Sequence, residues 1–123
     1  AVHTLHAQIK AADAVIISTP EYNKNISGVL KNALDWLSRV HPQPWTSKPV
    51  AILSAASGRA GGERAQYSLR HCMTPFNPRI LQGPEIMIAA ADNAFDGDER
   101  LINEFSTKSL TKLMTALRAE TNR

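Results

Sequence analysis

The sequence predicts an α/β protein, because short apolar runs of strand character alternate along it with amphipathic helical segments. Residues 14–18, 50–54 and 85–89 are the three runs with strand character. Continuous apolar runs rich in β-branched residues are typical of strands that are buried on both faces of a parallel sheet. Because strands joined through helices form right-handed βαβ units, we expect a doubly wound parallel sheet with helices on both faces, in three αβα layers.

Four segments have the periodicity of helices. Residues 1–12 place apolar side chains three and four positions apart, and Ser27 has the character of an N-cap for a helix from Gly28 to Arg39. A third helix is expected over residues 63–73. The turn at residues 96–98 leads into a long terminal helix, whose expected inward face comprises Leu101, Ile102, Phe105, Leu110, Leu113, Met114 and Leu117.

Length and composition fit one domain of an ordinary globular protein. The chain has 123 residues, of which 43% are hydrophobic and 20% charged. No apolar stretch approaches the roughly 20 residues that a membrane span requires, and no basic segment followed by an apolar run opens the chain. Cys72, the only cysteine, excludes an internal disulfide and is typical of a reducing compartment. We therefore expect a cytoplasmic protein without a membrane partner.

The charge pattern does not indicate a nucleic-acid partner. The formal net charge is +3, and its basic excess is scattered rather than gathered in a stripe or tail. A mildly positive surface favours anionic ligands such as nucleotides, although this charge alone does not identify one.

Two loops follow the first two predicted strands, and both lead into helices. They are residues 19–27, with the sequence TPEYNKNIS, and residues 56–62, with the sequence ASGRAGG. Ligands of open parallel sheets bind outside the carboxyl ends of the strands, where backbone N–H groups and helix N-termini offer donors. The three glycines of the second loop permit close approach of a flat ligand. Either loop alone is compatible with a simple connection, but together they indicate a binding site.

Other chemically suggestive residues have simpler interpretations. We expect Trp36 to have a packing role rather than to stack on a ligand, His3 and His6 to face solvent rather than bind zinc, and Cys72 to lie in the core. A subunit contact and a ligand contact are equally compatible with Tyr67 and Arg70, which lie on the helix after the second loop.

Five segments carry a likeness to a known family: residues 19–23 (TPEYN), 27–39 (SGVLKNALDWLSR), 48–52 (KPVAI), 58–67 (GRAGGERAQY) and 69–71 (LRH). In these segments the sequence resembles the NADPH-dependent FMN reductase family, which includes flavin, quinone, chromate and azo reductases. The resemblance extends over the whole chain but is weak after residue 85. It implies a flavodoxin-like fold, FMN and NADPH (or NADH) as cofactors, a small-molecule electron acceptor, and a homodimer or homotetramer.

The resemblance also assigns the candidate site residues. It implies that Pro20, Glu21, Tyr22 and Asn23 surround the isoalloxazine, with donors directed at its pyrimidine edge. Those donors would stabilise the reduced flavin, which becomes electron-rich there. The backbone of Ser57 and Gly58 is expected on the other side of the ring. Arg59 is expected to meet a phosphate of the nicotinamide nucleotide, because its guanidinium suits phosphate geometry. No catalytic side chain and no metal ligand is implied.

The family pattern begins earlier than residue 1, with a strand, an FMN-phosphate loop, a helix and a second strand. In the flavodoxin order 2-1-3-4-5, the three predicted strands are therefore strands 3–5 of the usual five. We expect residues 1–123 to be an N-terminally incomplete domain, in which the first predicted strand has an apolar, unpaired edge. A flavodoxin-like electron carrier and a truncated scaffold that binds no flavin are the alternatives to a reductase.

Overall fold

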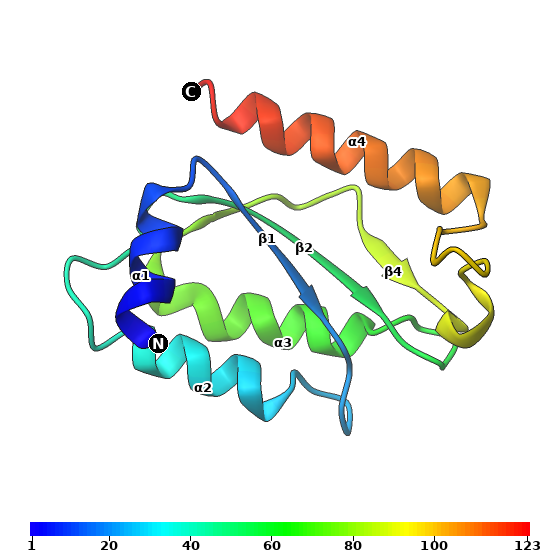
Figure 1. Cartoon of the computed structure of the whole chain (residues 1–123), viewed down its shortest axis with the longest axis horizontal. Coiled ribbons are helices and arrows are strands. Elements are labelled where there is room, and N and C mark those ends of the chain that lie inside the picture. Colours follow the sequence, from blue (N-terminus) through cyan, green and yellow to red (C-terminus); the bar gives the residue numbers. More distant parts are fainter.

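A computed structural model describes all residues, 1–123, as four α-helices around a small parallel sheet (Figure 1). In chain order, the helices and strands are α1 (Val2–Ala11), β1 (Val15–Thr19), α2 (Gly28–Leu37), β2 (Pro49–Ala55), α3 (Glu63–Met73), η1 (Thr74–Phe76), β3 (Arg79–Ile80), β4 (Ile86–Ile88), η2 (Ala91–Asn93) and α4 (Glu104–Glu120). The α/β class and the alternation of strands with helices are confirmed. No helix has both the length and the apolar character needed to cross a bilayer.

The sheet is parallel throughout and has β2 at its centre. β1 pairs with β2 from Val15 opposite Val50 to Thr19 opposite Ser54. β3 and β4 both pair with the other side of β2, β3 near its start and β4 near its end. They act as one interrupted strand, so the sheet is three strands wide. β1, β2 and β4 end at the same edge of the sheet, where Figure 1 shows the segments that follow them.

The two faces of the sheet carry separate cores, as a three-layer αβα arrangement requires. On one face, helices α1, α2 and α3 bury apolar side chains against β1 and β2, with Leu34, Leu69 and Met73 almost completely covered. On the other face, α4 alone covers β2 and β4 through Leu113 and Leu117. Figure 1 shows α4 on the side of the sheet opposite to α2 and α3.

One strand edge and part of one face remain uncovered. The outer edge of β1 has no pairing partner in the sheet. Ile16, in the middle of this strand, is 49% exposed, although a β-branched apolar residue in a parallel strand is normally buried. The expected unpaired edge is therefore present in the structure.

The structure corrects the expected termini of some elements and adds one short strand. β3 lies in the proline-flanked stretch that separates α3 from β4, and two residues are too short to give a sequence period. Helix α4 begins only at Glu104, because the Asn103 side chain accepts a hydrogen bond from Ser106 N and caps the helix there. Ile102 and Phe105 were expected to face inward but are 60% and 79% exposed.

The structure also corrects the interpretation of Trp36 and His6. Trp36 is 56% exposed on the outer side of α2, while Trp45 is buried in the core. His6 does not face solvent: it is buried, and its Nε2 lies 2.7 Å from Pro42 O. The helical periodicity of residues 1–12 could not predict the burial of His6, because the loop after α2 folds back to cover it.

Candidate functional site

The loop after β1 forms a tight turn that projects from the end of the strand. Tyr22 N donates to Asn25 O and Asn25 N donates to Tyr22 O, at 2.8 and 3.0 Å. The two central residues, Asn23 and Lys24, have φ of 53° and 67°, which is the backbone of a type I′ turn. The Tyr22 side chain is 60% exposed beside this turn. The turn therefore fixes the backbone that carries the Tyr22 ring and the Asn23 amide at the sheet edge.

Glu21 connects this loop to the next one. Its Oε1 accepts a hydrogen bond of 2.9 Å from Ala65 N, in the first turn of α3. The residue at the N-cap of α3 is Gly62, which has no side chain and makes no cap bond. Glu21 therefore replaces the missing cap from a loop 44 residues away in the sequence. The carboxylate at a helix N-terminus is also favoured by the helix dipole.

The glycine loop is held tightly against the sheet at its second half. Gly61 and Gly62 have φ of 63° and 93°, and a Cβ on Gly62 would lie 2.7 Å from the Ser54 side chain. A Cβ on Gly61 would lie 2.6 Å from the Met87 backbone. Only glycine combines this conformation with this closeness.

A buried polar network also fixes the glycine loop to β2 and β4. Ser54 Oγ donates to Gly61 O at 2.6 Å, and Gln66 Nε2 donates to both Ser54 Oγ and Ile86 O. Ser54 and Gln66 are fully buried. The Gln66 Oε1 atom has no partner. Because the buried donors of this network bond to the glycine loop, β2 and β4 at once, these three segments keep a single relative arrangement.

The first half of the glycine loop is open and rich in unpaired donors. None of the backbone N–H groups from Ser57 to Ala60 donates a hydrogen bond within the chain. An added Cβ on Gly58 would meet no atom within 4 Å, so space lies directly beside this residue. These features fit a flat ligand with several acceptor atoms, such as the isoalloxazine of FMN, since it needs backbone approach and many donors.

The charges around the two loops are mainly positive. Lys24, Arg59 and Arg64 take part in no ion pair, and the carboxylates of Glu21 and Glu63 lie near the same loops. An anionic ligand that approaches this edge therefore meets a small excess of positive charge. No group of three or more His, Cys, Asp or Glu side chains has the arrangement of a metal site.

The structure thus brings the seven expected site residues to one edge of the sheet, on two loops. Pro20, Glu21, Tyr22 and Asn23 lie after β1, and Ser57, Gly58 and Arg59 lie after β2. Glu21 differs from the others, because its carboxylate has a structural partner. Sequence reasoning missed Ser54 and Gln66; the small polar residue at the end of an apolar strand was the available signal for Ser54, but nothing local marked Gln66.

The Tyr67–Glu85 pair lies on the outer side of α3. The Tyr67 hydroxyl donates to Glu85 Oε2 at 2.9 Å, and the ring is 49% exposed. This hydrogen bond, and then the negative charge of Glu85, raise the pKa of Tyr67 above its ordinary value. Arg70, on the same helix, has a structural role: its guanidinium donates a hydrogen bond to Leu81 O and fixes the segment after β3.

Comparison with known proteins gives a consistent result. The sequence model of the NADPH-dependent FMN reductase family matches residues 1–93. The chain is 46% identical over 117 residues to an NAD(P)H-dependent FMN reductase of Pseudomonas aeruginosa, covering 95% of this chain and 63% of the relative. It is 40% identical over 116 residues to a quinone reductase of Escherichia coli strain K12, covering 94% of this chain and 62% of that protein.

A solved structure agrees with these sequence matches. The flavoenzyme NAD(P)H:acceptor oxidoreductase FerB of Paracoccus denitrificans superimposes with a TM-score of 0.78 at 30% identity, over 98% of this chain and 65% of that one. The chain thus spans a little under two thirds of the length of these relatives.

Proposed function

Because this chain belongs to the NADPH-dependent FMN reductase family, we propose that it is part of an FMN-dependent NAD(P)H oxidoreductase. In this proposal, reducing equivalents pass from NADPH or NADH through bound FMN to quinones, free flavin or similar small acceptors. The observation that carries it is the pair of loops at the ends of β1 and β2, joined by the hydrogen bond from Ala65 N to Glu21 Oε1.

The proposed site assigns a separate task to each loop. The Tyr22–Asn25 turn supplies the exposed Tyr22 ring and the Asn23 amide at one side of the flavin. The glycine loop supplies the unpaired N–H groups and the open space beside Gly58 on the other. Arg59 lies where it can attract a nucleotide phosphate. When bound, FMN supplies the hydride-accepting and electron-donating chemistry, so the chain provides positioning and fixed donors rather than a catalytic acid or base.

The uncovered part of the sheet supports a proposal about the rest of the domain. We propose that residues 1–123 form an incomplete flavodoxin-like domain. A further strand then pairs with the free edge of β1 and covers Ile16, and the loop after that strand holds the FMN phosphate. Pairing would remove the exposed edge, which is otherwise prone to association with other chains.

An apolar stripe supports the proposal that the protein is a homodimer or homotetramer. Val29 and Trp36 are 81% and 56% exposed, and they lie two turns apart on the outer side of α2. This helix starts directly after the Tyr22 loop, so a second copy packed along it would also approach the proposed flavin site. For the location, the single cysteine supports the proposal of a cytoplasmic protein, because unpaired cysteine is typical of reducing compartments.

The test is anaerobic reduction of the flavin-loaded protein. FMN is added, unbound flavin is removed by desalting, and NADPH is then introduced while the flavin absorbance is followed. Retained flavin that bleaches with NADPH, followed by steady NADPH consumption when a quinone is added, supports the reductase. Bound flavin without NADPH oxidation would identify an electron carrier instead. The test uses the protein with the strand and phosphate loop that complete the domain, and failure of that protein to retain FMN would contradict the proposed site.

A further inference from the structure

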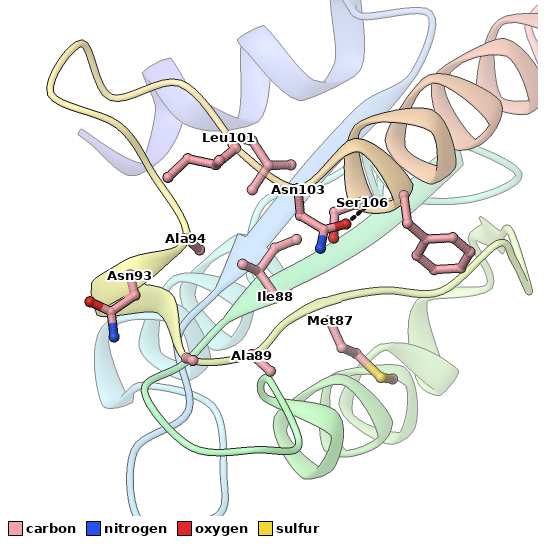
Figure 2. A pocket seen from close by; sticks show the side chains of 11 residues that line it. Met87, Ile88, Ala89, Asn93, Ala94, Leu101, Asn103 and Ser106 are labelled. Atoms are coloured by element: carbon pink, nitrogen blue, oxygen red, sulfur yellow. Dashed lines mark hydrogen bonds between the residues drawn. The ribbon is translucent and has the colours of Figure 1, made fainter.

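A second hollow lies at the end of β4, beyond the two loops described above (Figure 2). It is a cavity of about 460 Å³ between the end of β4, η2 and the start of α4, and eight of its eleven lining residues are hydrophobic. This volume and composition lie within the range of small-molecule sites in proteins. Its position at the carboxyl end of a strand is also the usual one for ligand binding in parallel sheets.

The wall of this cavity is held in place by its own hydrogen bonds. Residues 95–101 form a hairpin in which Asp96 Oδ1 accepts from Asp98 N and Arg100 N, at 2.8 and 2.9 Å. Ile102 N donates to Ala94 O at 2.9 Å and closes the base of the hairpin. Because these bonds need no ligand, the cavity is formed before anything binds, which lowers the entropic cost of binding.

The other side of the cavity is attached to the glycine loop. Ala90 N donates to Gly58 O at 3.1 Å, and Ala91 N donates to Ala56 O at 3.0 Å. Ala89 and Ala90 therefore form a thin partition with the cavity on one side and the glycine loop on the other. Because their side chains are small, Ala89 and Ala90 do not narrow the cavity.

One polar group of the cavity, the Asn103 side chain, favours a ligand with a hydrogen-bond acceptor. The Oδ1 atom of Asn103 is occupied, since it accepts from Ser106 N at 2.9 Å. This bond fixes the amide so that its Nδ2, a donor, faces away from the helix on the side of Ile88 (Figure 2). The Phe105 ring at the margin is 79% exposed and offers a flat apolar surface.

The charges around the cavity disfavour an anion. Residues 92–108 contain five acidic residues, Asp92, Asp96, Asp98, Glu99 and Glu104, and two basic ones, Arg100 and Lys108, of which Lys108 pairs with Glu104 at 3.3 Å. This net charge of −3 contrasts with the +3 of the whole chain. A nucleotide phosphate or a carboxylate that entered would meet like charge, whereas an uncharged ligand would not.

We propose that the cavity at the end of β4 is a binding site for an uncharged, planar aromatic compound that carries a carbonyl group. The ring system lies between Ile88 and Phe105, and the carbonyl oxygen accepts from Asn103 Nδ2. The proposal does not depend on flavin binding or on any reductase activity, because the cavity is complete without either.

The test uses coumarin, an uncharged aromatic lactone, and its anionic analogue coumarin-3-carboxylate. Binding to the purified chain is followed by amide NMR titration with FMN absent, and then again with FMN in excess. Coumarin is expected to bind with a sub-millimolar dissociation constant and to shift the signals of Ala89, Asn103 and Ser106. The carboxylate is expected to bind at least about tenfold more weakly, and FMN is expected not to displace coumarin.

Two variants separate ligand binding from folding. Asn103→Asp keeps the capping oxygen but removes the Nδ2 donor, and it is expected to weaken coumarin binding about fivefold or more. Its control is Asn122→Asp, which makes the same charge change at an exposed position near the C-terminus.

Phe105→Ala is expected to weaken coumarin binding to a similar extent. Its control is Val29→Ala, also at an exposed helical position, which is expected to leave coumarin binding unchanged. Unchanged coumarin affinity in both cavity variants, equal affinity for the carboxylate, or displacement by FMN would each overturn the proposal.

Discussion

Glu21 caps helix α3 from a different loop: its Oε1 accepts a hydrogen bond of 2.9 Å from Ala65 N, while the N-cap residue Gly62 has no side chain to do so. One carboxylate thus sets the distance between the two loops of the proposed flavin site. The arrangement leaves Gly62 free to adopt its positive φ against Ser54. Loss of this bond is expected to affect both stability and site geometry.

The first prediction concerns this cap. Glu21→Ala leaves Ala65 N without a partner and is expected to lower the free energy of unfolding by about 1–2 kcal/mol, as for a lost helix cap. Chemical denaturation measures it. Glu63→Ala is the control, because Glu63 lies in the same first turn but makes no ion pair or side-chain hydrogen bond. Equal destabilisation by the two variants would show that Glu21 acts only through its charge.

The second prediction uses two glycines of the same loop. Gly62→Ala places a Cβ 2.7 Å from the Ser54 side chain at a φ of 93°, so it is expected to destabilise the fold by about 2–4 kcal/mol. Gly58→Ala meets no atom within 4 Å and is expected to leave the melting temperature nearly unchanged. Thermal unfolding of both variants checks this, and a tolerated Gly62→Ala would be incompatible with the close packing on β2.

The third prediction concerns the Tyr22–Asn25 turn. Lys24 has a φ of 67°, a conformation that glycine adopts without strain and other residues adopt at a cost. Lys24→Gly is therefore expected to stabilise the protein by up to about 1 kcal/mol, measured as a higher denaturation midpoint. Lys112→Gly is the contrasting variant: it lies inside α4 and is expected to destabilise by about 1 kcal/mol. A destabilising Lys24→Gly would argue against the I′ turn.

The fourth prediction is a pH dependence at Tyr67. The hydrogen bond to Glu85 raises the pKa of Tyr67 above its ordinary value of 10.0, because it favours the protonated phenol. The stability from this bond is therefore fully present below pH 10.0, and it is lost as the pH rises through the raised pKa of the folded state.

Ultraviolet titration of tyrosinate in a Tyr22→Phe background isolates Tyr67, since the chain has two tyrosines. Glu85→Gln removes the negative charge and is expected to lower the pKa of Tyr67. A pKa that is the same with and without the Glu85 carboxylate would contradict the pairing.

Much of this architecture could be predicted from the sequence, because the strands are continuous apolar runs and the helices carry clear stripes. Residues 50–54 and Ser27 illustrate this: the run forms the centre of the sheet, and Ser27 Oγ accepts from Leu30 N as the N-cap of α2. The two-residue β3 and the late start of α4 could not be predicted. A two-residue strand has no period, and the hairpin at residues 95–101 uses apolar residues that continue the pattern of α4.

The position of the candidate site was predictable in part for the same reason. The two loops are recognisable because they follow apolar strands and lead into helices, although only α2 has a local cap, Ser27. Their connection through Glu21 and Ala65 is not, since it joins positions 44 residues apart. The buried Gln66 has no local signal either: its partners Ser54 and Ile86 come from two strands that only the tertiary fold brings together.

The most direct test of the proposed flavin site is the FMN dissociation constant of a matched pair of variants, Gly58→Trp and Gly97→Trp, beside the unmodified chain. Both glycines have open space where a side chain would begin, so both variants are expected to fold. Because only Gly58 lies on the proposed flavin loop, Gly58→Trp is expected to weaken FMN binding tenfold or more, about 1.4 kcal/mol, and Gly97→Trp to leave it unchanged. Equal FMN affinity in the two variants would contradict a flavin site on the glycine loop.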